Sequence, residues 1–202
     1  MELTLYDTPY SGNSYKCRLM LHKRGLAYRR ITVDIDKGES RTPEFLALNP
    51  NGRVPLLVLP DGTALAESNA ILAWLARGTA YLPDEPVAFA QTLQWLFFEQ
   101  YSHEPNIATV RYWLTHNVEI TLYRELAIAH KREQGVAALQ VMETHLQTHT
   151  FFVGTAPTIA DIALYAYTHV AEEGGFSLEP YPQIRDWLAR VAEDAPHIPI
   201  DA

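Results

Sequence analysis

The sequence lacks several features that mark large classes of protein. It contains a single cysteine, Cys17, which excludes an intrachain disulfide and any CxxC pair. No apolar run is long enough to span a membrane, and the first residues show no basic stretch followed by an apolar one. We therefore expect a cytoplasmic protein in a reducing compartment, with neither a secretion signal nor a membrane-spanning segment.

The sequence also lacks any run rich in lysine or arginine. Its 16 basic and 24 acidic residues give a net charge of −8 with histidine neutral. An acidic chain of this kind repels phosphate backbones and anionic membrane surfaces, so we expect neither nucleic acid nor a membrane as a partner. With 48% apolar and 20% charged residues, the composition is that of a globular protein, which excludes a disordered or fibrous chain.

The spacing of apolar residues changes along the chain, and this change predicts two domains. In the first part, short alternating runs and helical stretches follow one another in the order β-α-β-α-β-β-α. Its first three elements form a βαβ unit, and Pro60-Asp61-Gly62 separates two apolar runs as in a hairpin. We predict an α/β domain over residues 1–80 and an all-helical domain over residues 87–202, joined by a turn-rich linker.

The second domain is predicted to be a bundle of four or five helices. Apolar residues recur there at helical spacing in four stretches: Leu93, Leu96, Phe97 and Tyr101; Val136, Leu139, Met142 and Leu146; Ile159, Ile162, Ala163, Ala166 and Val170; and Ile184, Trp187, Leu188 and Val191. Pro105 lies inside the first long pattern. Because proline has no N–H group and clashes with the preceding turn, it predicts a kink or a break there.

The loop TPYSGNSYK at residues 8–16, between the first strand and the first helix, is the first candidate site. Ligands of open α/β sheets bind at the carboxyl ends of the strands, where a helix N-terminus presents free N–H groups and suits an anion. Ser11, Asn13 and Ser14 would add side-chain donors at that point. Alternatively, these residues only form a turn and cap the helix.

Four motifs occur on the predicted elements: SGNSYKCR at 11–18, PEFLALNPNGRVP at 43–55, ESNAIL at 67–72 and TIADIAL at 158–164. Together with the order of the elements, they resemble the soluble glutathione transferase family. The resemblance extends over nearly the whole chain. It implies a thioredoxin-like N-terminal domain that binds glutathione, an all-helical C-terminal domain that forms the wall for a second substrate, and a homodimer.

The resemblance implies catalytic roles for Ser11 and Asn13. Ser11 matches the thiol-activating hydroxyl of the serine-type members of the family, and Asn13 resembles the second donor of some bacterial classes. Holding a peptide thiol as a thiolate at neutral pH takes about 2–3.5 kcal/mol of preferential stabilisation of the anion. A hydroxyl and a helix N-terminus can supply that without a base. Tyr6, where tyrosine-type members place their activator, is the weaker candidate.

The resemblance also implies contacts to glutathione itself. Pro55 would follow a cis peptide bond, which turns the backbone of Val54 toward the cysteinyl part of the tripeptide. Ser68 would receive the γ-glutamyl carboxylate through its hydroxyl and backbone N–H groups, and Glu67 would pair with the ammonium group. The alternatives are an ordinary trans proline at the start of a strand and a capped helix N-terminus.

The glycyl carboxylate of glutathione requires a cation, and three residues are candidates: Arg41, Arg53 and Lys37. The two arginines match family positions better, although many members carry lysine or glutamine at the position of Arg53. Each of the three is otherwise a solvated surface charge. An apolar second substrate would require an apolar wall, for which we propose Tyr10, Tyr101, Tyr112 and Trp113; the same aromatic residues otherwise belong to the core or to a dimer surface.

Other residues are assigned structural roles. Cys17 lies on the apolar side of the first helix and is predicted to be a core thiol. Thr158 and Asp161 have the spacing of a capping box at the start of a buried helix. The eight histidines show no spacing typical of metal ligands, so we predict no metal.

The sequence therefore predicts a detoxifying glutathione transferase that conjugates glutathione to a small apolar electrophile. Two alternatives stay open. One is glutathione-dependent reduction of disulfides or peroxides, which yields oxidised glutathione in place of a conjugate. The other is a non-catalytic binding or scaffold protein that has kept the fold, because fold alone does not establish function.

Overall fold

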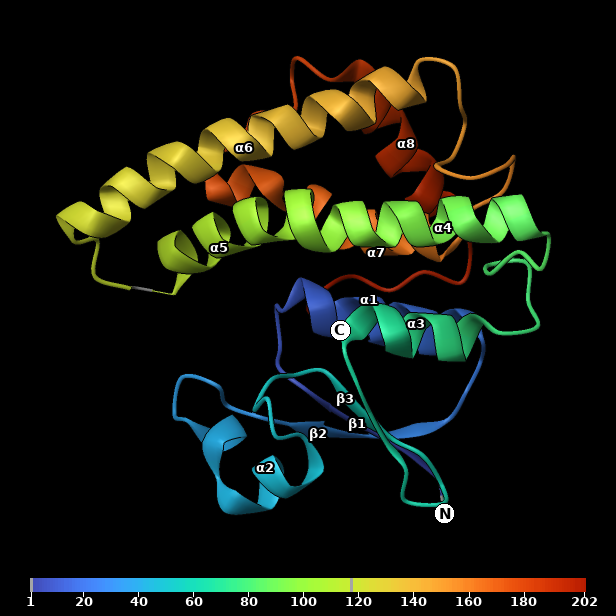
Figure 1. Ribbon diagram of the computed structural model, residues 1–202, viewed down its shortest axis with the longest axis vertical. Helices are drawn as coiled ribbons and strands as arrows, with labels where there is room; N and C mark the ends of the chain where they lie inside the picture. The colour runs from blue at the N-terminus through green and yellow to red at the C-terminus, as the bar shows by residue number, and fades with distance from the viewer. Residues whose placement is uncertain (1, 117) are drawn as a thin grey trace. The chain divides into compact units, whose positions relative to one another are not determined.

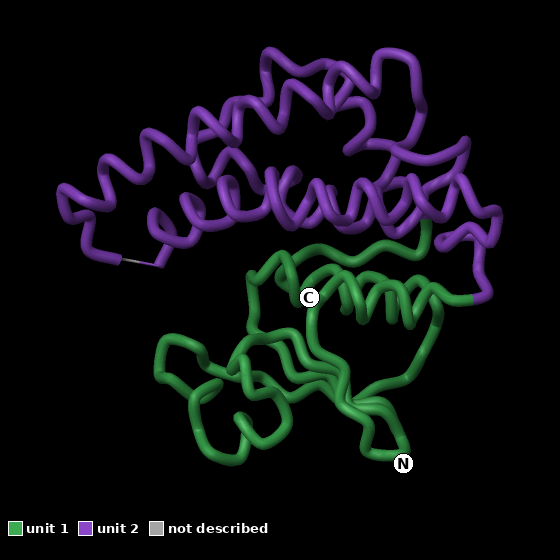
Figure 2. The backbone as a smooth tube through the Cα atoms, in the orientation of Figure 1, with its two compact units in different colours: residues 1–77, 195–202 green, residues 78–194 purple. Residues whose placement is uncertain are grey.

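The computed structural model describes residues 2–116 and 118–202, which form two compact units (Figure 2). Unit 1 comprises residues 1–77 and 195–202, and unit 2 comprises residues 78–194. Residues 195–202, expected in the helical domain from the sequence, belong to unit 1. They are held there because Arg18 and Arg30 donate hydrogen bonds to the backbone oxygens of Ile200 and Ala202, over 2.5 and 2.7 Å.

Unit 1 is built on a four-stranded sheet with the strand order β2-β1-β3-β4. β1 is parallel to β2 and antiparallel to β3, and β3 and β4 form the predicted hairpin. The elements follow the predicted order and confirm a thioredoxin-like fold: β1 (Leu3–Asp7), α1 (Gly12–Lys23), β2 (Tyr28–Thr32), a 3-10 turn (Glu39–Arg41), α2 (Pro43–Leu48), β3 (Leu56–Val58), β4 (Ala64–Ala66) and α3 (Ser68–Ala76).

The sheet of unit 1 is covered on both faces (Figure 1). α1 and α3 pack together on one face and α2 lies on the other. On the α2 face, buried Val33, Phe45 and Leu56 form an apolar cluster. Tyr6 joins this cluster, with its ring edge-on to that of Phe45 at a centroid distance of 5.9 Å. The alternation along β1 therefore directs Leu5 and Tyr6 to opposite faces of the sheet.

The core of unit 1 contains the single cysteine. Cys17 is fully buried in α1, and burial raises the pKa of its thiol to about 12. This burial confirms the prediction of a core thiol. A thiol that stays protonated at physiological pH is also a poor nucleophile.

Unit 2 is the predicted helical bundle. Its described residues form α4 (Pro86–Phe98), a π-helical turn (Glu99–His103), α5 (Glu104–Thr115), α6 (Leu122–Leu146), α7 (Ile159–Thr168), a 3-10 turn (Ala171–Gly174) and α8 (Pro182–Glu193). α7 is the central helix, since all of its residues are buried, and α4, α5 and α8 pack against it. Within the described ranges, the helices are too short or too polar to cross a membrane.

Near Pro105, where a kink or a break is predicted, the helix type changes, but the backbone stays helical from α4 through a π-helical turn into α5. The π-helical turn ends at His103, and Pro105 lies in the first turn of α5, where a missing N–H group is tolerated. Leu96 is buried, as its stripe requires, but Phe97 and Tyr101 are 68% and 87% exposed. Helical spacing therefore does not carry these two aromatic residues into the core. Tyr101 lies within the π-helical turn, which changes the α-helical register there.

The capping box at the start of α7 is also confirmed. The carboxylate of Asp161 accepts the backbone N–H of Thr158 over 2.8 Å, and the Thr158 hydroxyl accepts the backbone N–H of Ala160 over 3.2 Å. Asp161 also accepts bonds from the backbone of Phe152 and the indole of Trp187, each over 3.0 Å. Burial raises the pKa of this carboxyl group, while the donors around it act in the opposite direction.

Candidate functional site

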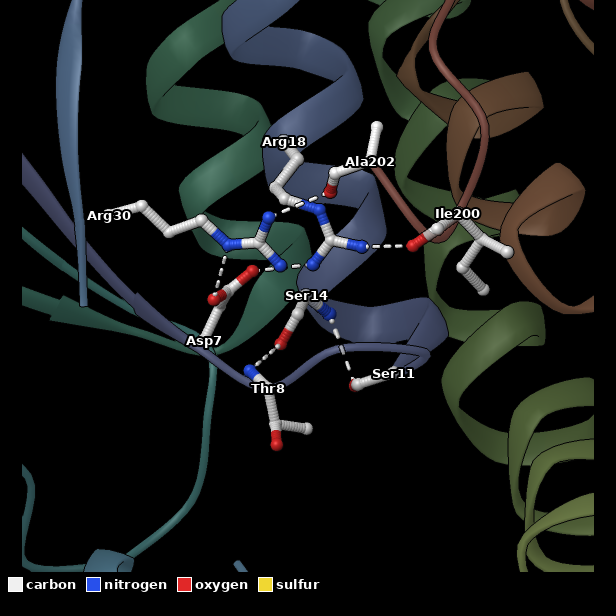
Figure 3. Close-up of polar contacts among 8 residues, drawn as sticks. All are labelled: Asp7, Thr8, Ser11, Ser14, Arg18, Arg30, Ile200 and Ala202. Carbon is white, nitrogen blue, oxygen red and sulfur yellow. Dashed lines mark hydrogen bonds and ion pairs between the residues drawn. The ribbon is translucent and has the colours of Figure 1, made fainter. Parts of the chain in front are cut away.

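The first predicted site residue, Ser11, is the N-cap of α1. Its Oγ accepts the backbone N–H of Ser14 over 3.3 Å, and the Oγ of Ser14 accepts the backbone N–H of Thr8 over 3.3 Å (Figure 3). A hydroxyl that accepts a hydrogen bond keeps its own hydrogen to donate. The capping role and a ligand-binding role of Ser11 are therefore compatible, and the helix N-terminus adds partial positive charge beside the hydroxyl.

Two further predicted residues, Asn13 and Ser68, meet although they come from different helices. Ser68 is the first residue of α3, and its hydroxyl donates to Oδ1 of Asn13 over 3.2 Å. The bond joins the N-terminus of α3 to that of α1. Both helices thus present their positive ends in the same region of unit 1.

The two N-termini share a buried cation, Lys16, that has no assigned role in the sequence analysis. The Lys16 side chain is fully buried, and its ammonium group donates to Asn13 Oδ1 over 2.8 Å and Ser68 Oγ over 3.3 Å. A third bond reaches Asn69 Oδ1 over 3.4 Å. The only signal in the sequence is that Lys16 follows Asn13 by three residues, which places both on one face of a helix.

The backbone at two predicted site residues has an uncommon conformation. Tyr10 and Glu67 have positive φ angles of 62° and 69°, and they are the non-glycine residues with this property in the described part of the chain. Such conformations cost free energy and cluster at functional sites. Glu67 is exposed and lies directly before α3, at the N-cap position, but its side chain makes no capping bond.

The Val54-Pro55 peptide bond is cis, as the family resemblance implies. Pro55 is buried and Val54 is half-buried, directly before β3. The carbonyl of the preceding residue, Arg53, accepts a bond from the Asn49 side chain over 2.8 Å.

The three candidate cations differ in their surroundings. Lys37 forms an exposed ion pair with Asp34 over 2.8 Å. Arg41 donates to the backbone oxygen of Asn51 over 3.0 Å, and its guanidinium fills the space beside Gly52, where a Cβ atom would lie 2.5 Å from it. Arg41 therefore contacts and stabilises the loop at residues 51–52, which leads to Arg53. The side chain of Arg53 is exposed.

A buried charge cluster lies behind the Ser11 loop and was not expected from the sequence. Asp7, the last residue of β1, is fully buried and pairs with Arg18 over 2.5 Å and with Arg30 over 2.9 Å (Figure 3). The same two arginines hold the backbone of residues 200 and 202. The cluster thus anchors both the start of the loop and the end of the described chain to unit 1.

Comparison with known proteins establishes the family. Residues 10–77 match the family model "Glutathione S-transferase, N-terminal domain", and residues 123–195 match "Glutathione S-transferase, C-terminal domain". The chain belongs to the glutathione S-transferase family. The crystal structure of a glutathione S-transferase from Pseudomonas fluorescens superposes with a TM-score of 0.95, at 48% identity over 99% of each chain.

Among other relatives of this glutathione S-transferase family member, two are not named as transferases and a third is. The disulfide-bond oxidoreductase YfcG of Escherichia coli is 31% identical, over 94% of this chain and 89% of its own. The protein URE2 of Eremothecium gossypii is 31% identical over 91% of this chain, which spans 63% of the length of that protein. Glutathione transferase URE2P6 of Phanerochaete chrysosporium, solved with oxidised glutathione, has a TM-score of 0.85 at 27% identity over 96% of this chain and 92% of its own.

The second-substrate wall predicted for this glutathione S-transferase family member stays a prediction. Tyr10 is 53% exposed and belongs to unit 1. Tyr101, Tyr112 and Trp113 belong to unit 2, where Tyr101 is exposed and the other two are half-buried. The Tyr112 ring stacks on that of His116 at a centroid distance of 4.4 Å. Among the described residues, no group of three or more histidine, cysteine or acidic side chains has the arrangement to hold a metal ion.

Proposed function

We propose that this glutathione S-transferase family member binds glutathione on unit 1 and stabilises its thiolate with Ser11 and the N-terminus of α1. The observation that carries the proposal is the position of the Ser11 hydroxyl at the N-cap, beside the first N–H groups of the helix. Tyr6, the other hydroxyl considered, packs in the apolar cluster on the α2 face. That environment favours Ser11 as the donor.

The remaining predicted residues would hold the rest of the tripeptide. Because the Ser68 hydroxyl donates to Asn13, we assign the γ-glutamyl carboxylate to the Ser68 backbone N–H, at the first position of α3. Exposed Glu67 would pair with the ammonium group. The backbone of Val54 would pair with the cysteinyl part, next to Pro55, and Arg53 or Arg41 would bind the glycyl carboxylate.

With the thiolate held in this way, the reaction is nucleophilic conjugation. The sulfur forms a bond to an electrophilic carbon of a small apolar substrate, and the leaving group departs with the bonding electrons. Glutathione releases its thiol proton to solvent on binding, so the sulfur is already a thiolate when it attacks and the protein supplies no base. The resemblance further implies that the chain acts as a homodimer, and its single cysteine suits the reducing cytoplasm.

Disulfide reduction is the second candidate, and the similarity to YfcG, named a disulfide-bond oxidoreductase, favours it. The bound thiolate would attack one sulfur of a disulfide and release the other as a thiol. A second glutathione would then attack the mixed disulfide, which releases the second thiol and leaves oxidised glutathione. The two candidates use the same thiolate and differ in the product.

The experiment compares the wild type with Ser11→Ala and Tyr6→Phe. Calorimetry gives the Kd for glutathione, and the ultraviolet absorbance of the thiolate, titrated with pH, gives the pKa of the bound thiol. Each protein is then assayed with an aryl halide and with a small disulfide. We expect the pKa of the bound thiol to be below that of free glutathione in the wild type and in Tyr6→Phe. In Ser11→Ala we expect this pKa to be higher than in the wild type by about 1–2, which corresponds to the loss of one charge-assisted hydrogen bond.

The products separate the candidates. A glutathione conjugate in the aryl halide assay supports the transferase. Oxidised glutathione in the disulfide assay, with no conjugate in the other, supports the reductase. Loss of activity in Tyr6→Phe with full activity in Ser11→Ala contradicts the assignment of Ser11. Absence of glutathione binding at millimolar concentration contradicts both candidates and favours the non-catalytic scaffold.

A further inference from the structure

We propose that Lys16 is a positioning residue: it orients the Asn13 amide so that the amide can donate a hydrogen bond to the glutathione thiolate. This inference rests on the proposed function of the Ser11 site. Lys16 lies one turn inside α1 and is fully buried, so its ammonium does not meet solvent or an exposed ligand directly. Its effect on glutathione therefore passes through the side chains that it contacts.

The contacts determine which end of the Asn13 amide faces Lys16. Two donors converge on one atom of that amide, the Lys16 ammonium at 2.8 Å and the Ser68 hydroxyl at 3.2 Å. Only the carbonyl oxygen can accept from both, so the NH₂ group of the amide is turned to the opposite side. An amide in this orientation presents donors, and not an acceptor, away from the buried lysine, as a bound thiolate requires.

The burial of Lys16 makes this orientation firm. A buried ammonium requires acceptors, because an unsatisfied charge in the protein interior is strongly unfavourable. If the Asn13 amide rotated by half a turn, its NH₂ group would face the ammonium and Lys16 would lose its shortest acceptor contact among the three to Asn13, Ser68 and Asn69. The charge of Lys16 thus opposes the orientation of Asn13 that could not donate to a thiolate.

The same arrangement links the two helix N-termini. Ser68 accepts from Lys16 over 3.3 Å and donates to Asn13 over 3.2 Å, which consumes its hydroxyl hydrogen. The Ser68 backbone N–H is left for the γ-glutamyl carboxylate under the proposed function. Lys16 is therefore expected to affect the thiol pKa through Asn13 more than it affects the affinity for the tripeptide.

The test is a double-mutant cycle read by the pKa of the bound thiol. We compare the wild type, Lys16→Met, Asn13→Ala and the double variant, with Lys23→Met as a matched lysine control on the same helix. Methionine keeps the length of the side chain and removes the charge and the donors. Each protein is titrated for thiolate absorbance, and its Kd for glutathione is measured by calorimetry.

We expect Lys16→Met and Asn13→Ala each to raise the pKa of the bound thiol by about one, and the double variant to raise it no further. Lys23→Met should leave the thiol pKa unchanged. Equal effects of Lys16→Met in both backgrounds would show that its charge acts directly, and an unchanged thiol pKa would show that Lys16 is only structural. Either result overturns the inference.

Ser68→Ala serves if Lys16→Met does not fold. It removes the second donor to Asn13 Oδ1 and keeps the backbone N–H. We expect a smaller rise of the thiol pKa that disappears in the Asn13→Ala background; additivity there overturns the inference. If the wild type fails to bind glutathione, the proposed function fails as well. If Ser11→Ala raises the thiol pKa and Asn13→Ala does not, the inference alone fails.

Discussion

The indole N–H of Trp187 donates to Oδ1 of Asp161 over 3.0 Å, which ties α8 to the N-terminus of α7 inside unit 2. The same oxygen accepts the backbone N–H of Phe152, and the other carboxylate oxygen accepts the backbone N–H of Thr158. One buried side chain thus connects two helices and the segment between α6 and α7.

The first prediction concerns this carboxylate. Asp161→Ala leaves a buried indole N–H and two backbone N–H groups without their acceptor, and each unsatisfied donor costs about 1–3 kcal/mol. We expect unit 2 to lose about 3 kcal/mol or more of its free energy of unfolding, measured by urea denaturation. Asp186→Ala, at an exposed position on α8, is the control, and equal losses in the two variants contradict the prediction.

The second prediction concerns the buried ion pair of unit 1. Arg18→Met leaves the carboxylate of Asp7 buried with Arg30 as its remaining ion-pair partner, and removing one member of a buried pair costs about 3–5 kcal/mol. It also removes the bond to the backbone oxygen of Ile200. We expect a fall in Tm and faster proteolysis of residues 195–202. Arg29→Met, at an exposed position in β2, should change neither, and a matching fall in that control contradicts the explanation.

The third prediction concerns pH and the N-cap of α4. The Glu85 carboxylate accepts the backbone N–H groups of Val87 and Ala88 over 3.0 and 2.7 Å, and these bonds lower its pKa. A folded-state pKa below the unfolded value gives stability above the unfolded pKa of about 4.3 that is lost as pH falls through the folded pKa.

Glu85→Gln should therefore lower the free energy of unfolding at pH 7, and its difference from the wild type should shrink toward pH 3. Urea denaturation at a series of pH values measures this. Glu133→Gln, at an exposed position inside α6, should show no such dependence. A pH-independent difference for Glu85→Gln contradicts a charge-dependent cap.

The fourth prediction concerns Cys17. Because burial raises the pKa of its thiol to about 12, the native protein should not react with an aromatic disulfide reagent at pH 8, whereas the unfolded chain should react at its single cysteine. The unfolded thiol ionises near ~8.5, so the folded state loses stability relative to the unfolded state as pH rises above that value. Rapid labelling of the folded protein would contradict a core position.

Cys17→Ala tests whether Cys17 is a core residue with no part in glutathione binding. Under the proposed function the reactive sulfur belongs to glutathione, so the substitution should leave the pKa of the bound thiol unchanged and cost only stability, through the small cavity it creates. A loss of thiolate absorbance with unchanged stability would indicate that Cys17 takes part in binding.

Much of the fold follows from the sequence because it depends on residues near one another in the chain. The alternation in β1 and β2, the Pro-Asp-Gly turn, the change of helix type just before Pro105 and the capping box of Thr158 and Asp161 each involve a few neighbouring residues. Their physical causes are periodicity, φ preferences and missing N–H groups, which are readable without tertiary contacts. The family resemblance, carried by motifs on those elements, added the cis bond before Pro55.

The sequence by itself thus determined the order of the elements, the family and the candidate residues Ser11, Asn13 and Ser68. Only the tertiary structure decided how these residues are connected. Lys16 is an ordinary helical lysine by local rules, and it becomes a buried cation because α3 brings Ser68 and Asn69 against α1. Likewise, residues 195–202 belong to unit 1 because Arg18 and Arg30, far away in the chain, bind their backbone oxygens. Buried charges require partners, and partners distant in the chain are supplied by packing, which no local pattern encodes.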